Sequence, residues 1–314
     1  MDSKPYLTVD KFVEKFVKTL LDAQPKARFN PKLLCPTILL IWIRGLNGTE
    51  SKSILESGIG PSSVCDGIQT KLDGYKRNPH HVMTAQLYET LKLSAKLINN
   101  RQEFSKVNSK RWLIPVPIGD CVKLDWYDIK APDSKNLYEG KKDTNLIQFF
   151  SQVDAFKGDR VSQMYFIHQL TKCIDTIQIG IRSGAMEQGM YMGVPTIYLE
   201  EKDSPSGERM ASLATDLLPK GSLATGNKML SPNKFGMFFR LKTKHLIGLN
   251  QARTLKEIEE IHNWLIERTS TQLGTRAAKG TLTRDEFDML NYNLAEICNN
   301  LKSYQSMLQK DKKS

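Results

Sequence analysis

Apolar residues in the middle of the chain alternate between short unbroken runs and longer periodic stretches. From residue 159 the order is "DRVSQMYFIHQLTKC", "DTIQIGI", "GAMEQGMYM" and "PTIYLEE". The first and third segments have the spacing of helices, with Asp159 as a capping residue, and the second and fourth are typical of buried strands. Because strands and helices alternate, the pattern predicts a parallel, doubly wound sheet and hence an α/β fold.

The remaining segments add elements on both sides of this unit. Helices are predicted in residues 9–24, 81–100, 205–218, 255–270 and 283–308. Strands are predicted in residues 37–45, 111–120, 145–153 and 234–241. The strand at 111–120 contains two prolines, which make it an edge strand or an irregular one. Thr283 and Glu286 have the spacing of a capping box and predict the start of the last helix.

Composition limits the class of protein. Hydrophobic residues make up 40% and charged residues 25% of the 314 residues, which is ordinary for a globular protein. The longest apolar run, in residues 33–43, is too short to span a bilayer, and the N-terminal residues lack the pattern of a secretory signal. The five cysteines are scattered without CxxC spacing, so neither a disulfide framework nor a zinc site is indicated. We therefore expect a cytoplasmic protein without a transmembrane segment.

The net charge of +11 favours anionic partners. The lysines and arginines occur in small, separated clusters, and the sequence has no arginine-rich arm or lysine-rich helix. Two interpretations stay open: a generally basic, solvated surface, and a face that binds nucleic acid or another polyanion.

Residues 177–201, "IQIGIRSGAMEQGMYMGVPTIYLEE", combine features of a ligand site. In parallel α/β sheets ligands bind at the carboxyl ends of strands, where the turn with Arg182 and Ser183 falls. A small-residue turn lets the backbone approach a ligand, and the N–H groups of a helix start favour phosphate. Glu187, in the first turn of the helix, is suited to accept hydrogen bonds from ribose hydroxyls. The segment predicts a nucleotide-sugar site, with packing of its methionines as the structural alternative.

The stretch "RSGAMEQGMYMGVPTIYLEE" resembles the donor-binding segment of GT-B-type glycosyltransferases and of related nucleotide-sugar epimerases. In that superfamily a strand leads to a small-residue turn, then to a helix with a Glu, then to Gly-x-Pro and another strand. The resemblance covers residues 175–210, and Glu187 lies closer to the turn than the Glu of these enzymes does. It implies a metal-independent transferase whose nucleotide-diphosphate sugar is a substrate, with no separate cofactor.

The resemblance also implies roles for single residues. The backbone after Arg182 would meet the diphosphate, Glu187 would hold the ribose, and the loop after the next strand would reach the transferred sugar. In a GT-B arrangement the loop after the first strand also faces the ligand, where an arginine meets phosphate and a glycine leaves room. The expected donor-binding residues are therefore Arg44, Gly45, Arg182, Ser183, Gly184, Ala185, Glu187, Glu208 and Arg209, with Glu201 as a further contact.

Two Rossmann-like lobes of GT-B type follow from the resemblance, and the polar residues 131–143 predict the boundary between them. The expected organisation is an N-terminal helix, an acceptor lobe, a nucleotide-sugar lobe and a C-terminal helix, in residues 1–30, 31–143, 144–280 and 281–314.

The catalytic base has three candidates and stays open. His81 precedes a helix, and Asp66 and Asp73 lie in a Gly-rich stretch, so each could remove a proton from an acceptor hydroxyl. The sequence has no metal motif, and no metal ligands are expected. The alternative function is a non-catalytic basic module that binds RNA or another polyanion on a Rossmann-like scaffold. An epimerase or hydrolase acting on the same nucleotide sugars is a third possibility.

Overall fold

The computed structural model describes residues 4–24, 34–43, 83, 85–103, 110–119, 145–156, 158–181, 184–201, 207–219, 237–243 and 282–311. The helices in these ranges are α1 (Lys4–Asp22), α5 (Ala85–Glu103), α6 (Leu146–Gln152), α7 (Arg160–Cys173), α8 (Gly184–Tyr191), α9 (Gly207–Leu213) and α11 (Arg284–Asp311). The strands are β1 (Leu34–Ile43), β2 (Lys110–Gly119), β3 (Asp175–Ile181), β4 (Thr196–Glu201), β5 (Thr215–Asp216) and β6 (Phe238–Thr243).

The described strands form one parallel sheet in the order β2-β1-β3-β4-β6-β5. β1 is a central strand that pairs with β2 on one side and with β3 on the other. The chain adds β2 to one side of β1 and then crosses to add β3 to the other side. The carboxyl ends of β1 and β3 therefore meet at the topological switch point of a doubly wound sheet. The predicted α/β class is confirmed.

The expected division into two Rossmann-like lobes is not confirmed. β1 and β2 fall in the expected acceptor lobe, 31–143, and β3 falls in the expected nucleotide-sugar lobe, 144–280, yet all three belong to the same sheet. The reason is direct pairing of β1 with β3, from Thr37↔Asp175 to Trp42↔Gly180. A strand that is apolar on both faces, such as β1, is stable only between two neighbours, and β3 supplies the second one.

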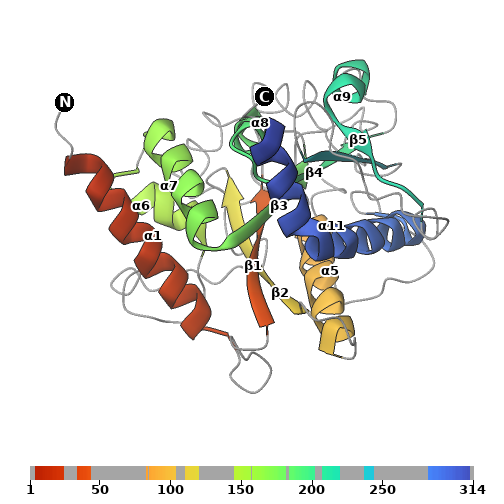
Figure 1. The fold of residues 1–314 in the computed structure, drawn as a ribbon, viewed down its shortest axis with the longest axis horizontal. Coiled ribbons are helices and arrows are strands. Elements are labelled where there is room, and N and C mark those ends of the chain that lie inside the picture. Colours follow the sequence, from red (N-terminus) through yellow and green to blue (C-terminus); the bar gives the residue numbers. More distant parts are fainter. Residues whose placement is uncertain are drawn as a thin grey trace, which may run out of the picture.

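Helices cover both faces of this sheet (Figure 1). α5 and α11 lie on one face, to the right in the view, where Leu91 and Leu290 join Ile179 of β3 in one buried cluster. α1, α6 and α7 lie on the other face, to the left, and α8 shares it, with Phe149 and Phe166 in its buried cluster. We call these two surfaces of the sheet the α11 face and the α8 face.

Residues 145–153 were expected to form a strand, but residues 146–152 form helix α6. The prediction was wrong because a short apolar run fits a strand and a buried helix equally well. Packing decides in favour of the helix, since Phe149 and Phe150 join Phe156 and Phe166 in an aromatic cluster with ring centroids 5.3–5.5 Å apart for the pairs with Phe166. The helix predicted at 205–218 is shorter in the structure, because α9 ends at Leu213 and residues 215–216 form β5 beside β6.

Two helix starts and one edge strand follow the sequence prediction. Asp159 caps α7 by accepting hydrogen bonds from the backbone of residues 161 and 162. Thr283 and Glu286 form the reciprocal capping box, with N···O distances of 2.8 and 3.2 Å. β2, which contains Pro115 and Pro117, is an edge strand of the sheet. The helix predicted at 255–270 lies outside the described residues.

Candidate functional site

The carboxyl edge of the sheet brings together two of the predicted ligand loops. β1 ends at Ile43 and β3 at Ile181, on neighbouring strands at the switch point. Arg44 and Gly45 directly follow β1, and Arg182 and Ser183 directly follow β3. α8 begins at Gly184, as predicted, so its first N–H groups lie at this edge. The side chains of these loop residues lie outside the described residues, as do His81, Asp66, Asp73 and the side chain of Glu208.

A buried amide on β3 holds α8 against the sheet. Gln178 is fully buried, and its Nε2 donates to the carbonyl of Met186 at 2.8 Å and to Oγ1 of Thr196 at 2.6 Å. Its Oε1 accepts a hydrogen bond from Nε1 of Trp42 on β1 at 2.8 Å. Strands β1, β3 and β4 and helix α8 are therefore joined by one side chain, and a fully satisfied buried network of this kind fixes a single arrangement.

Two glycines allow α8 to approach the sheet closely. A Cβ atom at Gly189 would lie 2.6 Å from the amide atoms of Gln178. A Cβ atom at Gly180 would lie 2.7 Å from Cβ of Trp42 and 3.1 Å from Sδ of Met186. The separations of 2.6 and 2.7 Å are too short for a carbon atom. A side chain at Gly189 would therefore displace α8 or the Gln178 amide, and one at Gly180 would collide with Trp42 of β1.

The structure joins two predicted site residues to each other. Nη2 of Arg209, on α9, donates to Oε2 of Glu187, on α8, at 2.6 Å. The Glu187 side chain is 15% exposed and that of Arg209 is 56% exposed, so the pair lies at the surface above the sheet edge. The sequence predicted that these two residues contact different parts of a ligand, and it did not predict their contact with each other.

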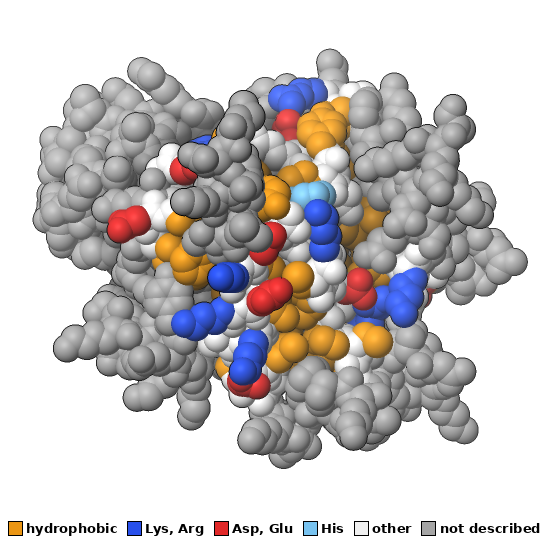
Figure 2. Space-filling view, turned by 60° about the vertical axis from the view of Figure 1, so that its left-hand side comes forward, with side chains coloured by type: hydrophobic (Ala, Val, Ile, Leu, Met, Phe, Trp, Pro, Cys, Tyr) orange, Lys and Arg blue, Asp and Glu red, His pale blue; other side chains and the backbone are white. Residues whose placement is uncertain are grey.

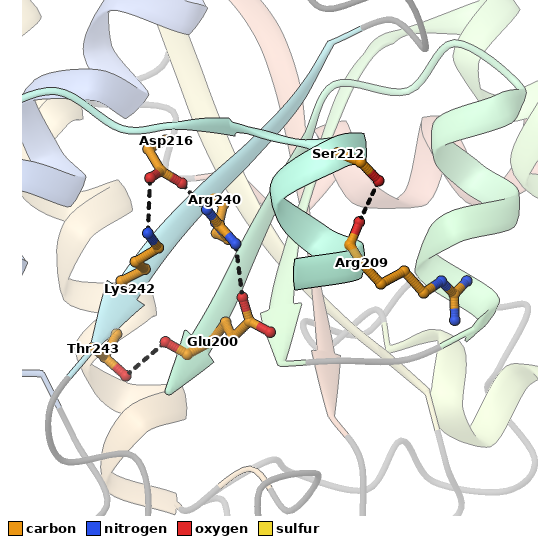
Figure 3. Close-up of polar contacts among 7 residues, drawn as sticks. All are labelled: Glu200, Arg209, Ser212, Asp216, Arg240, Lys242 and Thr243. Atoms are coloured by element: carbon orange, nitrogen blue, oxygen red, sulfur yellow. Dashed lines mark hydrogen bonds and ion pairs between the residues drawn. The ribbon is translucent and has the colours of Figure 1, made fainter. Parts of the chain in front are cut away.

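A second charged group joins β4, β5 and β6 (Figure 3). Arg240 of β6 donates through Nε to Asp216 of β5 at 2.5 Å and through Nη1 to Oε2 of Glu200 of β4 at 3.3 Å. Lys242 also contacts Asp216, at 3.1 Å. The side chains of Arg240 and Glu200 are 4% and 3% exposed. A buried ion pair is thus connected to solvent through Asp216, which is 47% exposed.

The surroundings of Asp216 favour its ionised form. Burial by itself would raise the pKa of this carboxyl group, but the hydrogen bonds and charges of Arg240 and Lys242 outweigh burial. The pKa of Asp216 is therefore lowered from its ordinary value of 3.8.

Glu200 and Arg240 were not among the predicted site residues. Each is a charged residue near the end of an apolar strand, in "PTIYLEE" and "MFFRL". A buried charge needs a partner, so one charge in each of two buried strands was a signal that the strands are neighbours. β4 and β6 do pair, with Tyr198 opposite Arg240. Among the described residues, no three His, Cys, Asp or Glu side chains are grouped as metal ligands would be.

The amino edge of the sheet contains a different buried arginine. Arg111 of β2 donates through Nη1 to Asp175, the first residue of β3, and to Oγ1 of Thr37 on β1 at 3.2 Å. The Arg111 side chain is 3% exposed and that of Asp175 is 25% exposed. Cys298 of α11 lies in the core near this pair, and burial raises its pKa to about 12. This thiol is therefore protonated at neutral pH and is not a reactive group.

The outer surface near α1 and α7 has mixed charge (Figure 2). On the side turned forward in that view, the Lys and Arg side chains of the described residues are interspersed with Asp and Glu. A groove of about 370 Å³ on this surface is lined by both signs of charge, with Glu14, Lys18 and Asp22 beside Cys173. No described helix has the length and hydrophobicity needed to cross a membrane.

Comparison of the chain with protein-family models, with curated proteins and with solved structures gave no match.

Proposed function

We propose that this protein binds a nucleotide-diphosphate sugar at the carboxyl edge of its sheet and acts as a GT-B-type glycosyltransferase. The diphosphate would lie at the start of α8, against the backbone of Ser183, Gly184 and Ala185, with Arg182 and Arg44 as cationic contacts. The bond between the sugar and the diphosphate would break as the acceptor hydroxyl bonds to the same carbon and gives its proton to a base. Donors fixed around the departing diphosphate would stabilise the negative charge that develops on it.

The observation that carries the proposal is the position of this turn at the switch point between β1 and β3. In doubly wound sheets this is where helices on opposite faces diverge and leave room for a ligand. The start of α8 adds oriented N–H groups, which favour an anion. Gln178 and the two close glycines support the proposal further, because they fix the distance between this helix start and the sheet.

The ion pair of Glu187 with Arg209 refines the expected role of Glu187. Arg209 contacts Oε2 of this carboxylate, so the ribose hydroxyls would bind through Oε1 or replace the guanidinium. In the first case Arg209 is a positioning residue for the ribose contact. In the second case nucleotide binding would release Arg209 toward the diphosphate, where a guanidinium makes strong hydrogen bonds.

The acceptor half of the enzyme is the least supported part of this proposal. A GT-B enzyme has a second lobe for the acceptor, and the described strands all belong to one sheet. Asp66, Asp73 and His81 remain the proposed bases, and they lie outside the described residues.

A thermal-shift panel tests the nucleotide site. UDP, GDP, ADP and CMP, with the corresponding nucleotide sugars, are added to the purified full chain. A ligand at about a hundred times its Kd adds about 2.7 kcal/mol to the free energy of unfolding, which raises Tm by roughly 5 °C for a chain of this size. Glu187→Gln is expected to reduce that shift to less than half.

The matched control is Glu89→Gln on α5, which removes a carboxylate from an i, i+3 pair with Lys92 on the α11 face. It is expected to leave the ligand-induced shift unchanged. A chain that none of the nucleotides stabilises would contradict the proposal, and so would equal effects of the two substitutions.

The net charge of +11 favours one alternative, a polyanion-binding module. Its signature is RNA binding whose affinity falls steeply with salt, together with no shift of Tm by any nucleotide. The mixed charges on the face in Figure 2 do not support it on that side of the molecule. An epimerase or hydrolase would share the nucleotide site and differ in product, which chromatography of the reaction mixture would identify.

A further inference from the structure

Glu200 has an unusual position for a carboxylate. It is the penultimate residue of β4 and its side chain is 3% exposed. Gly180 and Ile181 of β3 pair with Tyr198 and Leu199, so Glu200 comes directly after the last residue of β4 that pairs with β3. It shares the α8 face with Tyr198, because residues two apart in a strand point to the same side. Glu200 therefore lies near the end of β3, which the proposed diphosphate turn follows in the sequence.

Only one oxygen of this carboxylate accepts a hydrogen bond from a described residue. Oε2 accepts the hydrogen bond from Arg240 at 3.3 Å, whereas Oε1 has no hydrogen-bond partner among the described residues and is buried. In Figure 3, Oε2 faces Arg240 and the other oxygen points away from it. A buried carboxylate oxygen without a donor is costly, by roughly 1–3 kcal/mol or more, so the site is completed by a group that donates one.

The charge around Glu200 selects the kind of donor. Arg240 already supplies a positive charge, and Asp216 and Lys242 balance each other on its other side. A second cation at Oε1 would have to lie close to Arg240 and would be repelled, so a neutral donor fits better. A hydroxyl group is the neutral donor that a sugar carries, and sugar hydroxyls adjoin the diphosphate in the ligand proposed above.

We propose that Oε1 of Glu200 accepts a hydrogen bond from a hydroxyl of the sugar attached to the diphosphate, so that Glu200 is a specificity-determining residue for that sugar. This inference rests on the proposed nucleotide-sugar site. Arg240 is the positioning residue, because it holds the carboxylate in place while Asp216 holds Arg240.

The test measures the contribution of the sugar to binding separately from that of the nucleotide. Isothermal titration calorimetry on the full chain compares UDP with UDP-N-acetylglucosamine, GDP with GDP-mannose and ADP with ADP-glucose. In Glu200→Gln the carbonyl oxygen is expected to face Arg240, which places an NH₂ group where Oε1 was, so an acceptor becomes a donor. This variant should bind the preferred nucleotide sugar at least tenfold more weakly and the matching nucleoside diphosphate within twofold of the wild type.

Glu89→Gln is the matched control, since it makes the same change of a carboxylate to an amide on α5 and leaves Glu200, Arg240 and Asp216 unchanged. It should keep the affinity for the nucleotide sugar within threefold of the wild type. Equal weakening of sugar and nucleotide binding by Glu200→Gln would overturn the inference, as would no weakening at all. In those cases nucleoside diphosphate binding by the wild type still supports the proposed function, whereas a wild type that binds none refutes both.

A second measurement covers the case in which Glu200→Gln does not fold. The wild type is titrated with forms of its preferred nucleotide sugar in which single hydroxyls of the sugar are removed or inverted. At least one change should weaken binding tenfold, because it removes the donor to a buried acceptor. Affinities that all stay within twofold would overturn the inference.

Discussion

The two ends of the sheet each contain a buried arginine that joins neighbouring strands, but the acids that face them differ. At the amino edge, Arg111 contacts Asp175, whose side chain is 25% exposed and keeps access to water. Near the carboxyl edge, Arg240 contacts Glu200, whose side chain is 3% exposed. Water therefore helps to stabilise the charge of Asp175, whereas the charge of Glu200 is stabilised by protein groups alone.

This difference agrees with two roles, a structural one for the Arg111 pair and the ligand-binding one proposed above for the Arg240 pair. The Arg111 pair joins β2, β1 and β3 at the amino edge of the sheet, which is opposite to the edge that the predicted ligand loops follow. The Arg240 pair leaves one oxygen of Glu200 without a donor among the described residues. A buried polar atom without a hydrogen-bond partner is unfavourable for stability and calls for an explanation. For Glu200, near the end of β3, the explanation proposed above is a ligand.

Arg240→Met is expected to lower the free energy of unfolding more than the other substitutions considered. This substitution leaves the carboxylate of Glu200 buried without a cation, and breaking a buried pair in this way costs about 4 kcal/mol. The free energy of unfolding from urea titrations, followed by circular dichroism, measures the loss. A loss below about 1 kcal/mol would mean that Glu200 reaches water and that the comparison is wrong.

Arg111→Met is expected to cost less, about 2 kcal/mol, because Asp175 is partly exposed and can be hydrated when its partner is removed. The same urea titration measures it, with binding of the preferred nucleotide as a second readout. The substitution should leave nucleotide affinity unchanged, since the amino edge is opposite to the ligand loops. Equal losses of unfolding free energy in Arg111→Met and Arg240→Met would contradict the distinction between the two ends of the sheet.

The double substitution Glu200→Met with Arg240→Met sharpens the explanation. Replacing both members of a buried ion pair with apolar side chains is often nearly neutral, so the double variant should lie within about 1 kcal/mol of the wild type. It should also bind a nucleoside diphosphate but lose the added affinity for its sugar. A double variant less stable than Arg240→Met alone would show that the unpaired carboxylate is not the cause of that variant's instability.

Asp216→Asn is expected to change the free energy of unfolding least, and the size of this change depends on pH. The pKa of Asp216 is lowered in the folded protein, so the ionised group adds stability above pH 4, and this is lost as the pH falls through the folded pKa. At pH 7 the substitution should cost about 0.5 kcal/mol after solvent screening. Urea midpoints measured from pH 2.5 to 7 should approach those of the wild type at the acid end, and parallel curves would contradict the assignment.

Local signals in the sequence predicted most helices and strands. The features that the sequence analysis missed depend on contacts between segments that are far apart in the chain. The capping box of Thr283 and Glu286 spans three residues and was found directly. The pairing of β1 with β3 joins positions 37 and 175, and a hydrophobic run does not specify which strand will lie beside it. This is why the sequence did not predict that β1 and β3 belong to the same sheet. Helix α6 was misread because its aromatic partners, such as Phe166, come from another helix.

The candidate site likewise has features that adjacent residues predict and features that depend on packing between distant segments. The start of α8 and the place of Glu187 in its first turn follow from adjacent residues and were predicted. The contact of Glu187 with Arg209 depends on how two helices pack, although both residues had been named. The contact of Glu200 with Arg240 depends on the register of β4 against β6, which no local pattern contains.

The prolines of β2 have a consequence for the protein in a crowded cell. Residues two apart in a strand direct their backbone N–H groups to the same side, so Pro115 and Pro117 leave one side of β2 without two donors. β2 pairs with β1 along its whole length, so that side is the outer edge of the sheet. β5, at the opposite edge, is only two residues long and carries the charged Asp216. Both edges of the described sheet thus have features that disfavour pairing with a further strand, and such features oppose strand-to-strand aggregation.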